Sequence, residues 1–383
     1  MFWEKEGKLI YSYDGETVCI EAWGKDALRV RATKNRSFTG RDWALEAKDA
    51  HAGEVEIFED PSAKGGAFAN MYEGTDTSYG KITNGKLHAV IDSGSVITFY
   101  HEDGRVLLKE HFRRLRDEES MPLNIMGREY SNGVGDNFRI VARFVARKGE
   151  KIFGMGQYQQ HELDLKGCML ELAQRNSQVS VPFYLSSIGY GFLWNNPGVG
   201  QVMFANNGTE WVTESGKEID YLVIAGDTPA EIEENYMTLT GKPPMMPEYG
   251  MGFWQCKLRY WNQEQLLSVA RKYKELGVPL DVIVVDFFHW TKQGEFKFDP
   301  KYWPDVPGMC RELKEMGIQV VVSVWPTVDI YSENFEEMKE KGYLVRTEHG
   351  VPLTMLCGGN EVFFDATNPD ARTYVWEKIK KNY

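Results

Sequence analysis

The stretch LDVIVVDFFHW at residues 280–290 decides the fold class of this chain. Its first six residues are apolar except for Asp281, which is typical of a strand covered on both faces of a parallel sheet. A helical pattern precedes the stretch; it begins at Asn262 and ends at Gly277, residue types that cap the two ends of helices. The stretch therefore predicts a helix followed by a buried parallel strand, with a carboxylate and aromatic rings directly after it.

A second unit of the same kind follows along the chain. A helical pattern at 306–316 ends at Gly317 and leads into the apolar run 318–324. The segment 249–255 is a plausible first strand of the series, and further helical patterns lie at 332–341 and from Asn368 to the end of the chain. Strands and helices that alternate in this way predict repeated β/α units, as in a (β/α)8 barrel.

Residues 1 to about 225 carry strand patterns and almost no helical ones. Asn84-Gly85 separates two extended runs, and this dipeptide is preferred in tight hairpin turns. Further short strand patterns lie at 95–100, 181–185 and 221–224, with turn residues between them. Many short strands at this spacing predict a β-sandwich.

The pattern changes between residues 227 and 247. Thr228 and Pro229 suit the start of a short helix over 230–239, and three prolines follow within 241–247, where neither a helix nor a central strand can absorb them. The chain is therefore predicted to be a multidomain β plus α/β protein. We place an N-terminal β-sandwich with its linker at residues 1–245 and a barrel-type domain at 246–383.

Charge and composition exclude several classes of protein. Lys and Arg number 44 against 56 Asp and Glu, a net charge of −12, which argues against a nucleic-acid partner. The one basic cluster, residues 113–116, runs directly into acidic residues 117–119 and predicts a solvated turn or face. No stretch approaches the roughly 20 apolar residues of a membrane span. The first residues lack the features of a signal peptide, so the prediction is a cytoplasmic protein without a membrane partner; a homo-oligomer stays open.

Metal and cofactor motifs are missing from the sequence. The five cysteines show no Cys-x-x-Cys spacing and the histidines lack ligand spacing, so no metal site is predicted; the cysteines are Cys19, Cys168, Cys256, Cys310 and Cys357. Gly154-Met155-Gly156 lacks the third glycine of a dinucleotide fingerprint. We therefore expect no cofactor.

The residues that could carry chemistry follow the predicted strands. In β/α barrels the loops after the strands build the active site. Asp286 follows an apolar run, where a carboxylate needs a partner or a ligand, and a structural ion pair is the alternative interpretation. Phe288 and Trp290 follow it, and Trp325 ends the next strand. These rings could be core residues, but beside a carboxylate at one end of a sheet they suit a sugar, whose C–H face packs on rings while its hydroxyls bond to Asp.

Several longer motifs identify the chain as similar to glycoside hydrolase family 31. Residues 154–157, 171–176, 181–185 and 189–196 resemble the N-terminal, galactose-mutarotase-like sandwich of that family. Residues 252–255, Asp286, Trp325-Pro326 and 365–369 resemble the opening of its catalytic barrel, and the α-xylosidase branch is the nearest match. The resemblance covers essentially the whole chain.

The resemblance implies a retaining exo-α-glycosidase that acts on oligosaccharides through a covalent glycosyl intermediate. It places Asp286 on the terminal sugar, with Trp325, Phe287, Phe288 and Trp290 lining the site and Asn176 contributed by a sandwich loop. Many α-glucosidases of the family carry an aspartate where this chain has Phe288. Because a ring cannot satisfy a C6 hydroxyl, we expect terminal α-xylosyl residues as the substrate, with an α-glucosidase as the alternative.

The resemblance also implies that the catalytic pair is absent from this chain. In the family the nucleophile lies on the fourth barrel strand and the acid/base lies further on, so both are expected beyond Tyr383. Only three barrel strands are evident here, whereas a closed barrel of about 250 residues has eight. The chain is therefore expected to be the N-terminal part of a longer enzyme. A non-catalytic carbohydrate-binding fragment is the alternative from a different class.

Overall fold

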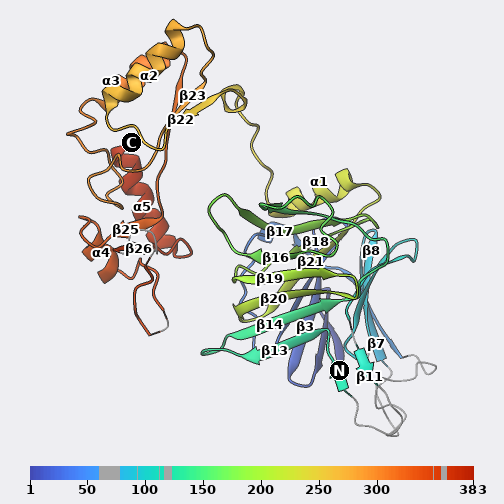
Figure 1. Cartoon of the computed structure of the whole chain (residues 1–383). Coiled ribbons are helices and arrows are strands. Elements are labelled where there is room, and N and C mark those ends of the chain that lie inside the picture. The colour runs from blue at the N-terminus through green and yellow to red at the C-terminus, as the bar shows by residue number, and fades with distance from the viewer. Residues whose placement is uncertain (60–77, 93, 112, 116–122, 348, 355–359) are drawn as a thin grey trace. The chain divides into compact units, whose positions relative to one another are not determined.

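A computed structural model describes the chain apart from residues 60–77, 93, 112, 116–122, 348 and 355–359 (Figure 1). The described residues form two compact units, the N-terminal unit Met1–Pro243 and the C-terminal unit Pro244–Tyr383. Cys357, Arg116 and the acidic residues 117–119, which the sequence singled out, lie outside the described residues.

The largest sheet of the N-terminal unit has nine strands, and every described pair in it is antiparallel. In this sheet β21, the last strand of the unit, pairs with β4, the fourth strand along the chain. The sheet therefore joins the beginning of the unit to its end. The strands in spatial order are β1 (Phe2–Lys5), β2 (Lys8–Tyr13), β3 (Glu16–Trp23), β4 (Ala27–Thr33), β21 (Ile219–Ala225), β18 (Tyr190–Trp194), β17 (Val179–Ser186) and β15 (Ile152–Gln157), with β5 (Ala50–His51) paired to β3.

Two five-stranded sheets complete this unit, together with a two-stranded ribbon (Figure 1). The first sheet consists of β10 (Val106–Lys109), β9 (Ile97–His101), β8 (Leu87–Ile91), β7 (Ser78–Asn84) and β6 (Glu54–Glu59). The second consists of β13 (Arg128–Asn132), β14 (Phe138–Phe144), β20 (Gly208–Gly216), β19 (Gly200–Ala205) and β16 (Met169–Leu172). The ribbon pairs β11 (Arg113–Leu115) with β12 (Leu123–Ile125), so part of the predicted basic turn is a strand.

One hydrophobic core joins the three sheets, since it contains buried residues from each of them. Its centre is aromatic: the ring of Trp211 on β20 stacks on Phe192 and Trp194 of β18 at centroid distances of 5.1 and 5.6 Å. The predicted β-sandwich is confirmed. The Asn84-Gly85 hairpin is also confirmed, because Asn84 pairs with Leu87 across the turn and Gly85 takes the positive φ of 55° that such a turn requires.

Short helical elements accompany the sheets of the N-terminal unit. Helix α1 (Pro229–Thr240) follows β21 and begins as predicted, because the Thr228 hydroxyl accepts a hydrogen bond from the Glu231 N–H at 3.2 Å. A single 3₁₀ turn, η1 (Ala47–Asp49), precedes β5. Ile232 and Leu239 of α1 pack into a second cluster with Leu222 and Ile224 of β21.

The C-terminal unit contains a parallel sheet of three strands in the order β22-β23-β24. Buried residues of α2 and α3 pack with Ile283 and Val285 of β23, which covers one face of this strand. On the other face Val282 is buried and Val284 is half-buried. The strands are β22 (Trp254–Cys256), β23 (Val282–Val285) and β24 (Gln319–Val322), and the helices are α2 (Gln263–Glu275), α3 (Val306–Glu315), α4 (Phe335–Glu340) and α5 (Pro369–Asn382).

The helix caps of this unit agree with the sequence. Asn262 caps α2 through its amide oxygen, Asp305 caps α3, and Asn368 caps α5. Gly277 and Gly317 take φ values of 65° and 76° directly after α2 and α3, as glycine at a helix C-terminus does.

Four details differ from the expectation. The proposed first strand over 249–255 is mostly a 3₁₀ turn, η2 (Glu248–Met251), and only its end belongs to β22. The helical pattern before Gly277 predicts Leu276 on the buried face of the helix, but α2 ends at Glu275 and the Leu276 side chain is 63% exposed. Thr327–Asp329 is a separate strand, β25, antiparallel to β26 (Glu361–Phe363), because Pro326 cannot donate to a ladder. The helix expected at 332–341 begins only at Phe335, since the Ser332 hydroxyl accepts from the Asn334 N–H in a preceding turn.

Candidate functional site

The carboxyl ends of β22 and β23 place two reactive side chains together. Cys256 is the last residue of β22, and Asp286 directly follows β23. Because the strands are parallel and adjacent, both ends lie at the same edge of the sheet. The Cys256 Sγ lies 3.7 Å from the Asp286 Oδ2, and the Asp286 Oδ1 accepts a hydrogen bond from the Phe287 N–H at 2.8 Å.

The Asp286 carboxylate has no counter-ion among the described residues. In the described part of the chain, no lysine, arginine or histidine side chain forms an ion pair with it. The structural ion pair that the sequence left open is therefore not found. A half-buried carboxylate with one backbone N–H and one thiol beside it keeps acceptor positions for a ligand.

Four aromatic rings form one cluster next to Asp286. Phe287 lies 4.5 Å from Phe288 and 5.4 Å from Trp325, measured between ring centroids. Trp290 lies 6.2 Å from Phe288 and 6.3 Å from Trp325. The structure thus brings together five of the predicted site residues from the ends of two neighbouring strands, although it does not test what they bind.

Phe288 is held in an unusual backbone conformation. Its φ is 63°, in the left-handed region that a bulky side chain seldom adopts, and its side chain is 54% exposed. Residues kept in this region cost about 1–3 kcal/mol each and occur most often at functional sites. The backbone conformation and the exposure of Phe288 therefore make its ring a candidate ligand contact.

His289 supports the turn that carries these residues. It is buried, its Nδ1 lies 3.1 Å from the Asp286 carbonyl oxygen, and its Nε2 lies 2.8 Å from the Tyr383 hydroxyl. Burial lowers the pKa of His289 to about 4, so the ring is neutral at physiological pH. It therefore joins the strand-end turn to the tail of α5 and does not serve as a cation.

The sequence did not indicate Cys256 as a site residue. The signal was available, because Cys256 is the last residue of a strand and Asp286 directly follows the neighbouring one, but the predicted first strand ends one residue short of Cys256. Burial and the neighbouring Asp286 raise the pKa of the Cys256 thiol above its usual range. The thiol is therefore protonated at neutral pH, which suits a neutral lining group.

Asn176 belongs to the N-terminal unit. It is exposed in the tight turn between Arg175 and Gln178, after β16 and before β17, and the neighbouring Ser177 has a positive φ of 65°. The contact of Asn176 with a substrate bound at Asp286 remains a prediction.

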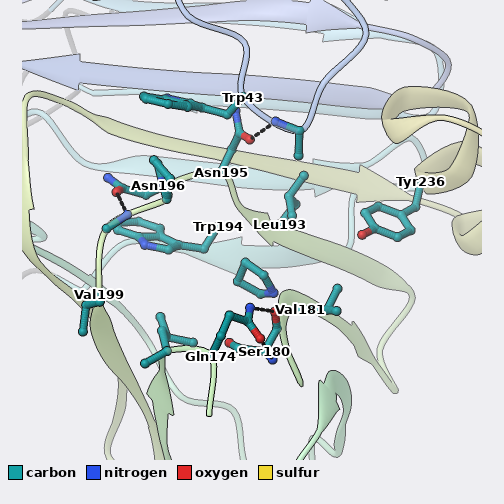
Figure 2. A pocket seen from close by; sticks show the side chains of 16 residues that line it. Trp43, Gln174, Ser180, Val181, Leu193, Trp194, Asn195, Asn196, Val199 and Tyr236 are labelled. Carbon is teal, nitrogen blue, oxygen red and sulfur yellow. Dashed lines mark hydrogen bonds between the residues drawn. The ribbon is translucent and has the colours of Figure 1, made fainter. Parts of the chain in front are cut away.

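A pocket of about 670 Å³ lies next to that turn in the N-terminal unit (Figure 2). Its polar groups bond to the protein itself: the Gln174 amide both donates to and accepts from the Ser180 backbone, and the Asn195 Oδ1 accepts from the Ala44 N–H. No carboxylate, histidine, lysine or cysteine lines it. The pocket therefore lacks groups for acid/base chemistry, and we place the candidate site at Asp286.

Two further findings bear on the type of site. The described residues contain no group of three or more His, Cys, Asp or Glu side chains that could hold a metal ion. Within the same residues, each helix is too short or too polar to cross a bilayer.

A β-sandwich followed by parallel β/α units, with a carboxylate and aromatic rings at the strand ends, defines the class of carbohydrate-processing enzymes built on a barrel. Comparison with protein families agrees. The model for the glycosyl hydrolases family 31 TIM-barrel domain matches residues 243–383, and the model for the glycosyl hydrolase 31 N-terminal galactose mutarotase-like domain matches residues 17–202. The chain belongs to glycoside hydrolase family 31, and its C-terminal unit is part of the family's barrel.

Three relatives illustrate the similarity. An uncharacterised family 31 glucosidase of Pseudescherichia vulneris is 43% identical over 99% of this chain and 70% of its own length. Alpha-xylosidase A of Aspergillus niger is 30% identical over 96% of this chain and 50% of its own length. The crystal structure of a family 31 α-xylosidase from a soil metagenome, complexed with xylose, is 48% identical with a TM-score of 0.88, and the match covers 100% of this chain and 56% of that one.

Proposed function

We propose that this chain is part of a retaining exo-α-glycosidase that removes terminal α-xylosyl residues from oligosaccharides. The proposal depends most on one observation, the exposed ring of Phe288 two residues after the unpaired carboxylate of Asp286. Support also comes from the names of two similar proteins, an α-xylosidase of Aspergillus niger and a xylose-bound α-xylosidase from soil.

The proposed role of Asp286 is to hold the terminal sugar. Its free lone pairs can accept hydrogen bonds from two neighbouring hydroxyls, and charge-assisted bonds of this type are stronger than neutral ones. The nearby rings of Phe287 and Trp325 offer apolar faces for the C–H groups of the sugar.

The proposed role of Phe288 is to select a pentose. A xylosyl residue has no hydroxymethyl group at C5, whereas a glucosyl residue would have to bury its C6 hydroxyl against the ring. An unmade hydrogen bond of this kind costs about 1–3 kcal/mol, which corresponds to a preference of about tenfold to a hundredfold.

The reaction needs two more carboxyl groups than this site contains. In a double displacement, one carboxylate attacks the anomeric carbon and expels the leaving oxygen, which a second carboxylic acid protonates. Water, deprotonated by that second group, then releases the sugar and the first carboxylate. We expect this pair on barrel strands that follow the three described here.

An α-glucosidase is the second candidate, because the relative that shares 43% identity carries the name glucosidase. Measuring kcat/KM of the full-length gene product on aryl α-xyloside and aryl α-glucoside decides between the two. We expect the xyloside to be preferred at least about tenfold. A preference for the glucoside would reject the proposed role of Phe288, and hydrolysis of neither substrate would reject the enzyme proposal.

A further inference from the structure

Arg259 contacts two aromatic rings at the edge of the candidate site. Its guanidinium carbon lies 3.5 Å from the centroid of the Trp261 ring and 5.0 Å from that of Phe288. Arg259 and Trp261 lie in the segment between β22 and α2, whereas Phe288 follows β23. Two neighbouring strand-end segments are thus joined through one cation.

The hydrogen-bond donors of Arg259 find no acceptor among the described residues. In the part of the chain that the structure describes, its side chain makes no ion pair and donates no hydrogen bond. This is unusual for a half-buried arginine, because the guanidinium carries five N–H donors. Arg271 of the same unit, by contrast, binds both Glu312 and Glu264.

The stacking orients these donors. A guanidinium carries no N–H on either of its two faces, so a ring that packs on a face leaves the donors at the edge free. A planar edge with parallel N–H groups matches either two neighbouring hydroxyls or a carboxylate.

The nearby charge favours hydroxyls over a carboxylate. Asp286 lies two residues from Phe288 and has no counter-ion, so an anionic ligand would meet its negative charge. A sugar hydroxyl both donates and accepts, and it can therefore satisfy Asp286 at one end of the site and Arg259 at the other.

Exposure indicates which sugar Arg259 would contact. The contacts run from Trp325 through Phe287 and Phe288 to Arg259 and Trp261. Trp325 and Phe287 are half-buried, but Phe288 is 54% and Trp261 61% exposed. Arg259 thus lies toward the solvent end of the cluster, beyond the rings closest to Trp325.

We propose that Arg259, held by Trp261 and Phe288, binds the sugar on the leaving-group side of the scissile bond by donating to two of its hydroxyls. The proposal rests on the proposed glycosidase function. It makes Arg259 a determinant of which xylosylated oligosaccharide is accepted, and not of which terminal sugar is removed.

The test compares two leaving groups in the full-length gene product. The substrates are aryl α-xyloside, whose leaving group has no sugar hydroxyls, and α-xylosyl-(1→6)-glucose. For Arg259→Met, which keeps length without donors, we expect the ratio of kcat/KM for the disaccharide to that for the aryl xyloside to fall about tenfold to a hundredfold. Arg259→Lys should lower the ratio less, because its ammonium group can still donate hydrogen bonds, although it lacks the planar pair of N–H groups of the guanidinium.

The control variant is Arg311→Met, an exposed arginine on α3 outside the site, which should leave the ratio unchanged. Equal losses on both substrates, or no loss on either, would overturn the role of Arg259. Competitive inhibition by glucuronate at least tenfold stronger than by glucose would also overturn it, because Arg259 would then bind a carboxylate and not sugar hydroxyls. If the unmodified enzyme hydrolyses no α-xyloside at all, the proposed function fails instead.

Discussion

The Cys256 Sγ lies 3.7 Å from the Asp286 Oδ2 across the ends of two adjacent parallel strands. The contact joins a thiol at this edge of the sheet to the carboxylate that is proposed to hold the sugar. Its consequences can be measured without any enzyme activity.

Replacing Asp286 by Asn should speed alkylation of Cys256. Burial and the Asp286 charge both raise the pKa of this thiol, and only the thiolate reacts with iodoacetamide. Removing the charge lowers that pKa, so at pH 8 we expect a rate increase of roughly twofold to fivefold, measured by mass spectrometry of the labelled peptide. Cys310 on α3 is the internal control and should react at an unchanged rate. An unchanged rate at Cys256 would contradict the electrostatic coupling.

Asp286→Ala should abolish most hydrolysis without unfolding the protein. The loss of two charge-assisted bonds to the sugar predicts a fall in kcat/KM of at least about 100-fold. Because Asp286 makes no ion pair in the described part of the chain, we expect the thermal midpoint to stay within about 2 °C. Glu315→Ala on the exposed surface of α3 is the matched control. Unchanged kinetics would remove Asp286 from the site.

Phe288→Asp should shift the preference toward glucosides. A carboxylate at this position can accept the C6 hydroxyl that the ring leaves unbonded, so the kcat/KM ratio of aryl α-glucoside to aryl α-xyloside should rise at least about tenfold. Phe288→Leu, which stays apolar, should keep the preference for xyloside. If the Asp variant keeps the original ratio, the side chain at 288 does not select the sugar.

His289 should make stability depend on pH. Its folded pKa of about 4 lies below the ordinary value of 6.5, so the unfolded chain binds more protons between these values. The free energy of unfolding should therefore be highest above pH 6.5 and fall as the pH drops toward 4, by up to roughly 3 kcal/mol from this group. Pulse proteolysis in urea should show a weaker pH dependence for His289→Gln than for the unmodified chain. His349→Gln, at an exposed position of the same unit, should show the original dependence.

The pair of Arg29 and Asp220 should be essential to the N-terminal unit. Arg29 donates to both carboxylate oxygens, at 3.0 and 2.6 Å, and both side chains are almost fully buried. Asp220→Ala removes a buried partner of Arg29, which keeps an ion pair with the partly exposed Asp42 and a hydrogen bond to the Arg41 carbonyl. The loss should cost about 3 kcal/mol and shift the urea midpoint of that unit downward. The exposed ion pair of Asp136 with Lys217 offers the control, since Asp136→Ala should barely move the midpoint. A double change to Arg29→Met and Asp220→Leu should restore part of the loss; no recovery would argue against the buried charge of Arg29 as the cause.

The parts of the fold that were predicted correctly depend on local signals. Asn262 and Gly277 bound α2, Asn368 begins α5, and the apolar run before Asp286 is a covered strand, because caps and hydrophobic period act within a few residues. The strand predicted over 249–255 was wrong because no local signal distinguishes a strand from a turn there. The glycines of this segment allow a turn as readily as a strand.

The sequence by itself determined the order of the elements, the change from strands to β/α units, and the presence of a carboxylate and rings after two strands. Only the tertiary structure decided that Cys256 lies against Asp286, that Phe288 takes a left-handed backbone, and that Arg259 contacts the rings of both Trp261 and Phe288. The physical reason is that strand pairing sets which loop ends meet. Two residues about 30 positions apart become neighbours through the register of a parallel sheet, and that register is set by packing over the whole unit.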